Sequence, residues 1–103
     1  GSIADTPFAD KPWEEPKLPL NIDRTLIEGN SGEDCFILNC ALAKLGYLAD
    51  GNQPGKYTPA TKEAVEWFQG ENNLVVDGKF GRKTKAALTA ELIKALKRIP
   101  PPM

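Results

Sequence analysis

Few side chains in this sequence have the types and spacing that catalysis requires. Its 103 residues include no histidine, so neither a Ser–His nor a Cys–His nucleophile pair can form. Carboxylates come close together twice, at Glu14 with Glu15 in a proline-rich segment and at Glu63 with Glu66 on one expected helix face. Glycoside hydrolysis needs two carboxyl groups held rigidly on either side of a cleft. Because neither pair meets this requirement, we expect no catalytic residue in this chain.

The two cysteines, Cys35 and Cys40, fall within one expected helix. At this spacing they are separated by ~7.5 Å along the helix axis and by ~140° around it. That separation is beyond the reach of a disulfide, so we expect two free, partly buried thiols, as in a protein made in a reducing cytoplasm. A zinc site would have to combine them with carboxylates at unsuitable spacing, and we therefore expect neither a metal nor a cofactor.

Charge divides the chain into an acidic and a basic half. Residues 1–54 carry nine acidic and four basic side chains, whereas residues 55–103 carry nine basic and five acidic ones. A basic half can attract an anionic polymer, such as nucleic acid or a bacterial cell wall. The alternative is a solvated helix face, because lysine is a good helix former. No run of ~18 apolar residues is present and no secretion signal is recognisable, so we expect no membrane-spanning segment and a single domain.

A short internal repeat organises the basic half. Residues 55–65 and 78–88 share a glycine, a lysine, an aromatic residue and a Thr-Lys-x-Ala-Val/Leu helix start. Two copies are too few for a solenoid, which needs at least three stacked units. We interpret the repeat as one loop-to-helix device used twice, with a glycine turn, an aromatic plug at Tyr57 or Phe80, and a helix start.

Hydrophobic periodicity predicts three helices and no sheet beyond a short extended link at 74–76. The helices are expected over residues 32–45, 58–70 and 81–98. Ser31 and Asp34 have the spacing of a capping box at the start of the first helix. Thr58 followed by Pro59 fits the start of the second, because proline is tolerated in the first helical turn.

The apolar positions of these helices are expected to form one core. The residues expected to be buried are Leu38, Leu42, Leu45, Val65, Phe68, Leu88 and Leu92. Phe36, Ile37 and Cys40 lie off the inward stripe of the first helix and suggest a second apolar face.

The first 25 residues differ in character from the rest of the chain. Gly1 and Ser2 resemble residues left by cloning, and four prolines follow among acidic residues. Proline favours extended, polyproline-like backbone, so we interpret this segment as an interdomain linker. The competing interpretation is an ordered arm, in which Trp13 lies across the helical body as a clasp and covers the second apolar face.

An ordered set of motifs between residues 26 and 97 resembles the peptidoglycan-binding domain that is appended to many bacterial and phage wall-lytic enzymes. The motifs are Gly29-Asn-Ser-Gly32, Leu38-Asn-x-x-Leu42-x-x-Leu45-Gly-Tyr-Leu48, Ala64-Val-x-x-Phe68-Gln69 and Leu74-Val-Val-Asp-Gly78-x-Phe80-Gly81-x-x-Thr84. The resemblance implies an all-α fold, a small orthogonal three-helix bundle with a pseudo-twofold relation between the repeat copies. It places the domain at 26–99, after the Pro-rich linker or arm at 1–25 and before a tail at 100–103.

The function that this resemblance implies is non-catalytic binding to peptidoglycan. The domain would hold a covalently linked hydrolase, or another envelope protein, on the cell wall, in the periplasm or outside the cell. We expect a monomer whose partners are the glycan or the stem peptide of the wall, without membrane contact. Neither the sequence nor the resemblance distinguishes glycan from stem peptide.

Ligand contact is predicted in a groove between the end of the first helix and the two repeated turns. Peptidoglycan presents sugar faces, amides and carboxylates, which aromatic, amide and basic side chains can meet. The candidate residues are Asn39, Tyr47, Tyr57, Trp67, Gln69, Asp77, Lys79 and Arg82. Several have a structural alternative: Tyr57 can be a core plug, Asn39 and Gln69 can bond loop backbone, and Asp77 can make a local turn bond.

Two other functions stay open at this point. Arg82, Lys83 and Lys85 at a helix start could enter the major groove of DNA, although the acidic first half disfavours nucleic acid. A protein-interaction or regulatory module that docks on its own enzyme would use the proline-rich arm and the face at Phe36 and Ile37.

Overall fold

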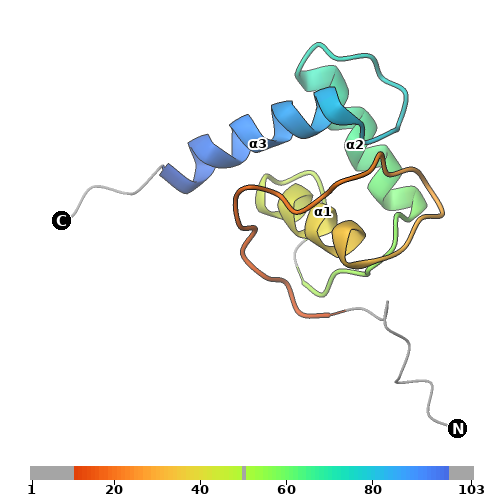
Figure 1. Ribbon diagram of the computed structural model, residues 1–103, viewed down its shortest axis with the longest axis vertical. Coiled ribbons are helices and arrows are strands. Elements are labelled where there is room, and N and C mark those ends of the chain that lie inside the picture. The colour runs from red at the N-terminus through yellow and green to blue at the C-terminus, as the bar shows by residue number, and fades with distance from the viewer. Residues whose placement is uncertain (1–10, 50, 98–103) are drawn as a thin grey trace, which may run out of the picture.

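The computed structural model describes residues 11–49 and 51–97, and within them it contains three α-helices and no strand (Figure 1). The helices are α1 (Glu33–Lys44), α2 (Pro59–Glu71) and α3 (Arg82–Lys97). The predicted small all-α three-helix bundle is therefore confirmed. None of these three helices is long and apolar enough to cross a membrane.

Helix α2 begins as its sequence predicts and ends at Glu71, one residue beyond the expected range. The N–H of Thr61 donates to Oγ1 of Thr58 at 3.1 Å, and Pro59 is the first helical residue. At the other end Asn73 has φ of 60°, a left-handed conformation that asparagine tolerates better than most residues. Local side-chain chemistry is enough to define both ends of this helix.

Helix α1 begins differently from the prediction. Its N-cap residue is Gly32, with φ of 141°, and no side chain caps the helix. The expected capping box of Ser31 and Asp34 is wrong because Arg24 binds the Asp34 carboxylate, with Nε 2.9 Å from Oδ2. This ion pair lowers the pKa of Asp34 and comes from a segment that precedes the helix, so the local pattern could not predict it.

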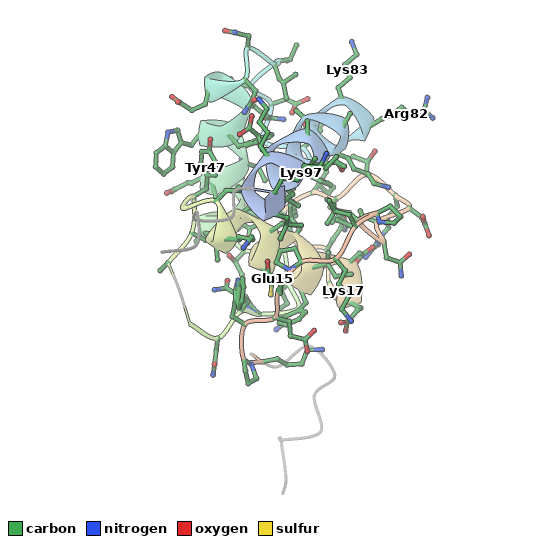
Figure 2. The ribbon with its side chains drawn as sticks, turned by 90° about the vertical axis from the view of Figure 1, so that its left-hand side faces the viewer. Glu15, Lys17, Tyr47, Arg82, Lys83 and Lys97 are labelled. Carbon is green, nitrogen blue, oxygen red and sulfur yellow. The ribbon has the colours of Figure 1, made fainter. Side chains whose placement is uncertain are left out.

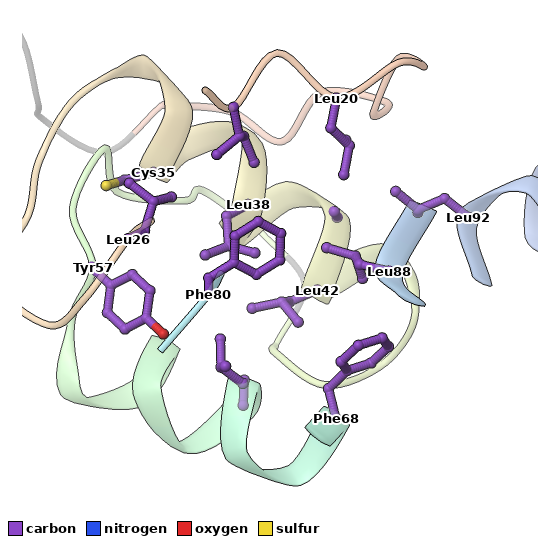
Figure 3. Packing of buried hydrophobic residues seen from close by; sticks show 14 residues of the cluster. Leu20, Leu26, Cys35, Leu38, Leu42, Tyr57, Phe68, Phe80, Leu88 and Leu92 are labelled. Carbon is purple, nitrogen blue, oxygen red and sulfur yellow. The ribbon is translucent and has the colours of Figure 1, made fainter. Parts of the chain in front are cut away.

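One hydrophobic core joins the three helices to the loop before α1 (Figure 3). Its largest members are Leu20, Ile22, Leu26, Leu38, Leu42, Tyr57, Val65, Phe68, Phe80, Leu88 and Leu92. Leu45, which we expected to be buried, is only partly buried because it lies at the C-cap, beyond the last turn of α1. The repeat-equivalent rings of Tyr57 and Phe80 both enter this core, as the interpretation of aromatic plugs predicts.

The proline-rich segment packs on the helical body from Lys11 onward. The backbone of Lys11 pairs with that of Gln53, and Nε1 of Trp13 donates to the carbonyl of Cys40 at 3.1 Å. Further along, Leu20 and Ile22 are buried in the core. The linker interpretation is therefore wrong for residues 11–25, and the ordered arm is what the structure shows; residues 1–10 lie outside the described part.

Burial of apolar side chains helps to order this arm. A fully buried leucine or isoleucine contributes ~1.5–3 kcal/mol, which offsets part of the ~1–2 kcal/mol of backbone entropy lost for each ordered residue. The arm also covers the second apolar face of α1, where Phe36 and Cys40 are buried. The ammonium of Lys11 lies 4.5 Å from the centre of the Phe36 ring.

Candidate ligand-binding site

Asn39 on α1 holds the first repeated turn from inside. Its side chain is fully buried, and Nδ2 donates to the carbonyls of Pro54 at 2.8 Å and Lys56 at 2.9 Å. Its Oδ1 accepts from the hydroxyl of Thr61 at 2.6 Å. In this position Asn39 bonds loop backbone, which is the structural alternative considered for it, and it does not face the surface.

Gln69 on α2 binds the backbone of the second repeated turn from inside the protein, as Asn39 binds that of the first. Its buried Nε2 donates to the carbonyl of Lys79 and to Oδ1 of Asp77, both at 2.9 Å, and to the hydroxyl of Thr84 at 3.1 Å. Its Oε1 accepts from the N–H groups of Asp77 and Gly78. All the hydrogen-bonding capacity of the amide is used inside the protein.

The side-chain amides of Asn39 and Gln69 play equivalent roles in the two copies of the internal repeat. Asn39 binds the carbonyl of Lys56 and Gln69 binds that of Lys79, which are equivalent positions of the repeat. The loop before α1 pairs with both turns: Leu26 exchanges two backbone hydrogen bonds with Phe80, and the loop at 29–30 does so with Tyr57. Each turn is therefore fixed from two sides before its helix begins.

Tyr57 and Asp77 complete the framework of the turns. The buried hydroxyl of Tyr57 donates to the carbonyl of Gly78 at 2.7 Å and so connects the first turn to the second. Burial raises the pKa of Tyr57. Asp77 is exposed, but its Oδ1 accepts from the N–H of Lys79 at 2.9 Å, the local turn bond considered for it. That bond and the one from Gln69 lower the pKa of Asp77.

Tyr47 and Trp67 form an aromatic surface beside α2. Their ring centres are 4.8 Å apart and the planes meet at 78°, an edge-to-face contact of the kind that aromatic pairs prefer. Tyr47 also contacts the buried ring of Phe68, at 5.4 Å. Trp67 is 55% exposed. The two rings border a hollow of about 400 Å³, which we call the aromatic hollow; its other lining residues are Leu48, Ala49, Ala60, Glu63 and Ala64.

Lys79 and Arg82 lie elsewhere, at the second repeated turn. They border a hollow of about 560 Å³ that also includes Thr25, Val75 and Lys83. In Figure 2, Tyr47 is on the left of the molecule, whereas Arg82 and Lys83 are at the upper right. The structure thus divides the predicted groove: it exposes the aromatic pair on one side and the basic residues on another.

Several residues around these hollows were not foreseen from the sequence. Thr25 reaches the second turn because the loop before α1 pairs with Phe80, and no local pattern indicates that pairing. Ala60 and Glu63 join the aromatic hollow by their position on α2. Helical spacing places both residues on the same exposed side of α2 as Trp67. This spacing was the only feature of the sequence that could have indicated their place at the hollow.

The two thiols are free, as predicted, and they are fully buried where partial burial was expected. Burial raises the pKa of Cys35 to about 11, and it also raises that of Cys40. Among the described residues there is no cluster of three or more histidine, cysteine or carboxylate side chains that could hold a metal.

We expect the buried thiols to make the fold sensitive to alkaline pH. In the unfolded chain a thiol loses its proton near pH ~8.5, whereas Cys35 in the folded protein keeps its proton to about pH 11. The thiol contribution to stability is therefore complete below the unfolded pKa and falls from there until the pH reaches about 11, where the folded thiol also loses its proton. Urea unfolding measured from pH 7 to 11 checks this. Cys35→Ser with Cys40→Ala should flatten the alkaline limb, and a limb of unchanged steepness would contradict the assignment to the thiols.

Comparison with known proteins adds two similarities. A family model described as "Putative peptidoglycan binding domain" matches residues 31–88, more than half of the chain. The chain is also similar to a "Probable CtpA-like serine protease" from each of two strains of Staphylococcus epidermidis. Each is 29% identical over 72 residues, which are 70% of this chain and 14% of the relative. The chain thus spans about one seventh of the length of these curated relatives.

Proposed function

Because the chain belongs to the family of putative peptidoglycan-binding domains, we propose that it is a non-catalytic module that holds an attached protein on the bacterial cell wall. It acts outside the cytoplasm, as a monomer, on the glycan strands of the wall. Tethering raises the effective concentration of a linked enzyme at its substrate without any further contact. The similarity to one seventh of a serine protease supports attachment to a catalytic domain.

The observation that carries this proposal is the aromatic hollow. A tryptophan that is 55% exposed and packs edge-to-face with a neighbouring tyrosine offers a rigid apolar surface with a polar edge. Such rings suit sugars, since a pyranose has one apolar face and a rim of hydroxyl groups. The hollow of about 400 Å³ beside the rings is open to a polymer that passes across α2.

The test is binding to purified peptidoglycan sacculi. We expect Trp67→Ala and Tyr47→Ala each to weaken retention by ~1–3 kcal/mol, the range of aromatic hot spots at other interfaces. The melting temperature of the Trp67→Ala protein should change little because the ring is mostly outside the core. Co-sedimentation with sacculi at several protein concentrations measures the affinity.

Two variants serve as controls for this experiment. Trp67→Phe keeps a ring in the hollow and should recover most of the binding. Ile93→Ala removes exposed apolar surface from α3 at a residue that does not line the hollow, and it should bind like the parent. If Trp67→Ala binds sacculi as tightly as the parent, the aromatic hollow is not the glycan site.

A further inference from the structure

Four basic side chains gather where the second repeated turn meets α3. They are Lys79, Arg82, Lys83 and Lys85. Among the described residues, none of the five ion pairs involves any of the four. The ammonium of Lys85 donates to the backbone carbonyl of Ile22. The other three carry exposed charges without a protein counter-ion in the described part of the chain.

These cations border two hollows that share a common wall. The first, of about 560 Å³, includes Lys79, Arg82 and Lys83. The second, of about 300 Å³, includes Arg82 and Lys85 with Arg24. Thr25 and Gly81 also line both hollows, so Arg82 stands between them. We call the two together the basic hollow.

Few carboxylates oppose this charge. Two line the basic hollow, Asp23 and Asp77. The Asp77 carboxylate already accepts hydrogen bonds from Gln69 and from the N–H of Lys79. Arg24 is already paired with Asp34, but the other four cations of the basic hollow still outnumber Asp23 and Asp77, and the positive end of the α3 dipole adds to the same field.

We propose that the basic hollow binds the carboxylate groups of peptidoglycan stem peptides, while the aromatic hollow binds the glycan. This rests on the proposed function and assigns separate surfaces to the two components of the wall. Arginine pairs with carboxylates through two parallel hydrogen bonds, and the neighbouring lysines add charge without fixed geometry. Val75, 79% exposed at the rim, offers apolar surface to the methyl groups of a peptide.

The charge of the whole chain favours a stem peptide over nucleic acid. The formal net charge is −1, and a long polyanion is repelled by the remaining acidic surface. A stem peptide presents isolated carboxylates, which need only the local cations of the basic hollow. Nucleic acid is therefore an outcome of the test rather than the proposed ligand.

The experiment compares native sacculi with sacculi whose carboxyl groups have been converted to amides by carbodiimide coupling. The parent protein should bind amidated sacculi about fivefold more weakly at low salt, and the difference should shrink as salt is raised. The double variant Arg82→Gln with Lys83→Gln should bind native sacculi about fivefold more weakly than the parent. On amidated sacculi the double variant and the parent should be equal. The matched control is Lys94→Gln with Lys97→Gln, which removes the same charge from the other end of α3 and should behave like the parent.

Each other result has a definite meaning. If amidation leaves the binding of the parent unchanged, the carboxylate proposal is overturned. This comparison uses only the parent protein, so it does not depend on whether a variant folds. If the double variant binds native sacculi like the parent while Trp67→Ala does not, the proposal is overturned but the wall-binding function stands. If the parent binds no sacculi, both fail together. Retention of the parent on DNA that the double variant loses, with no difference on sacculi, would assign the cations to nucleic acid.

Discussion

Replacement of Phe68 by alanine is expected to lower the free energy of unfolding by about 3–5 kcal/mol. The ring is 1% exposed and packs in the core, where it also makes an edge-to-face contact with Tyr47. Removing it takes away the transfer free energy of the ring and leaves a cavity that rigid neighbours fill only in part. Small domains have ~5–15 kcal/mol in total, so this single change should remove a large share of the stability and lower the melting temperature strongly. Urea denaturation followed by circular dichroism measures the change.

The adjacent residue provides the control. Trp67→Ala removes a larger ring one position along α2, but that ring is mostly exposed, so the loss of stability should be about 1 kcal/mol or less. The difference between the stability losses of Phe68→Ala and Trp67→Ala tests which face of α2 points into the core. A Phe68→Ala protein that melts within a few degrees of the parent would show that the inner face of α2 has been assigned wrongly.

Replacement of Gln69 by leucine should also be severe, although leucine is similar in size and apolar. The buried amide satisfies the carbonyl of Lys79 and the N–H groups of Asp77 and Gly78. A buried polar group left without a partner costs ~1–3 kcal/mol, and at least the N–H of Gly78 and the Lys79 carbonyl would lose theirs. We expect a loss of about 3 kcal/mol in the free energy of unfolding.

Hydrogen exchange makes this prediction specific to the turn. The N–H of Gly78 should be protected in the parent and should exchange quickly in the Gln69→Leu protein, even where the helices keep their protection. Glu71→Leu, an exposed change two residues further along α2, should leave both stability and exchange nearly unchanged. Equal protection of Gly78 in parent and variant would mean that the amide of Gln69 is dispensable for the turn.

The two clamped turns would let a small domain present the two proposed binding surfaces in a preformed state. Asn39 and Gln69 hold equivalent carbonyls, and Tyr57 connects the turns through its bond to Gly78. Backbone that is fixed in this way loses little further entropy when a ligand binds, which favours affinity. Under the proposed function, Asn39, Gln69 and Tyr57 would not touch the ligand as we predicted but would support the exposed residues that do.

Much of the fold could be predicted because helices depend on local patterns. The apolar spacing of α1, α2 and α3 and the cap at Thr58 involve residues within a few turns of each other. The start of α1 could not be predicted, since Arg24 takes the Asp34 carboxylate from outside the helix. The packed arm was foreseen only as the competing interpretation, because proline favours an extended backbone but says nothing of where that backbone lies.

The candidate site shows the same division between local and distant causes. The sequence by itself determined which side chains have the chemistry to be candidates for binding a wall polymer, and it contains no histidine for a Ser–His or Cys–His pair. It did not determine which of them point outward: Asn39 and Gln69 carry amides that suit a ligand and a loop equally well. Only the tertiary structure decided this, because burial depends on contacts between segments far apart in the chain. Those contacts turned the two amides inward, brought Tyr47 to Trp67, and left Lys79, Arg82 and Lys83 exposed at the second turn.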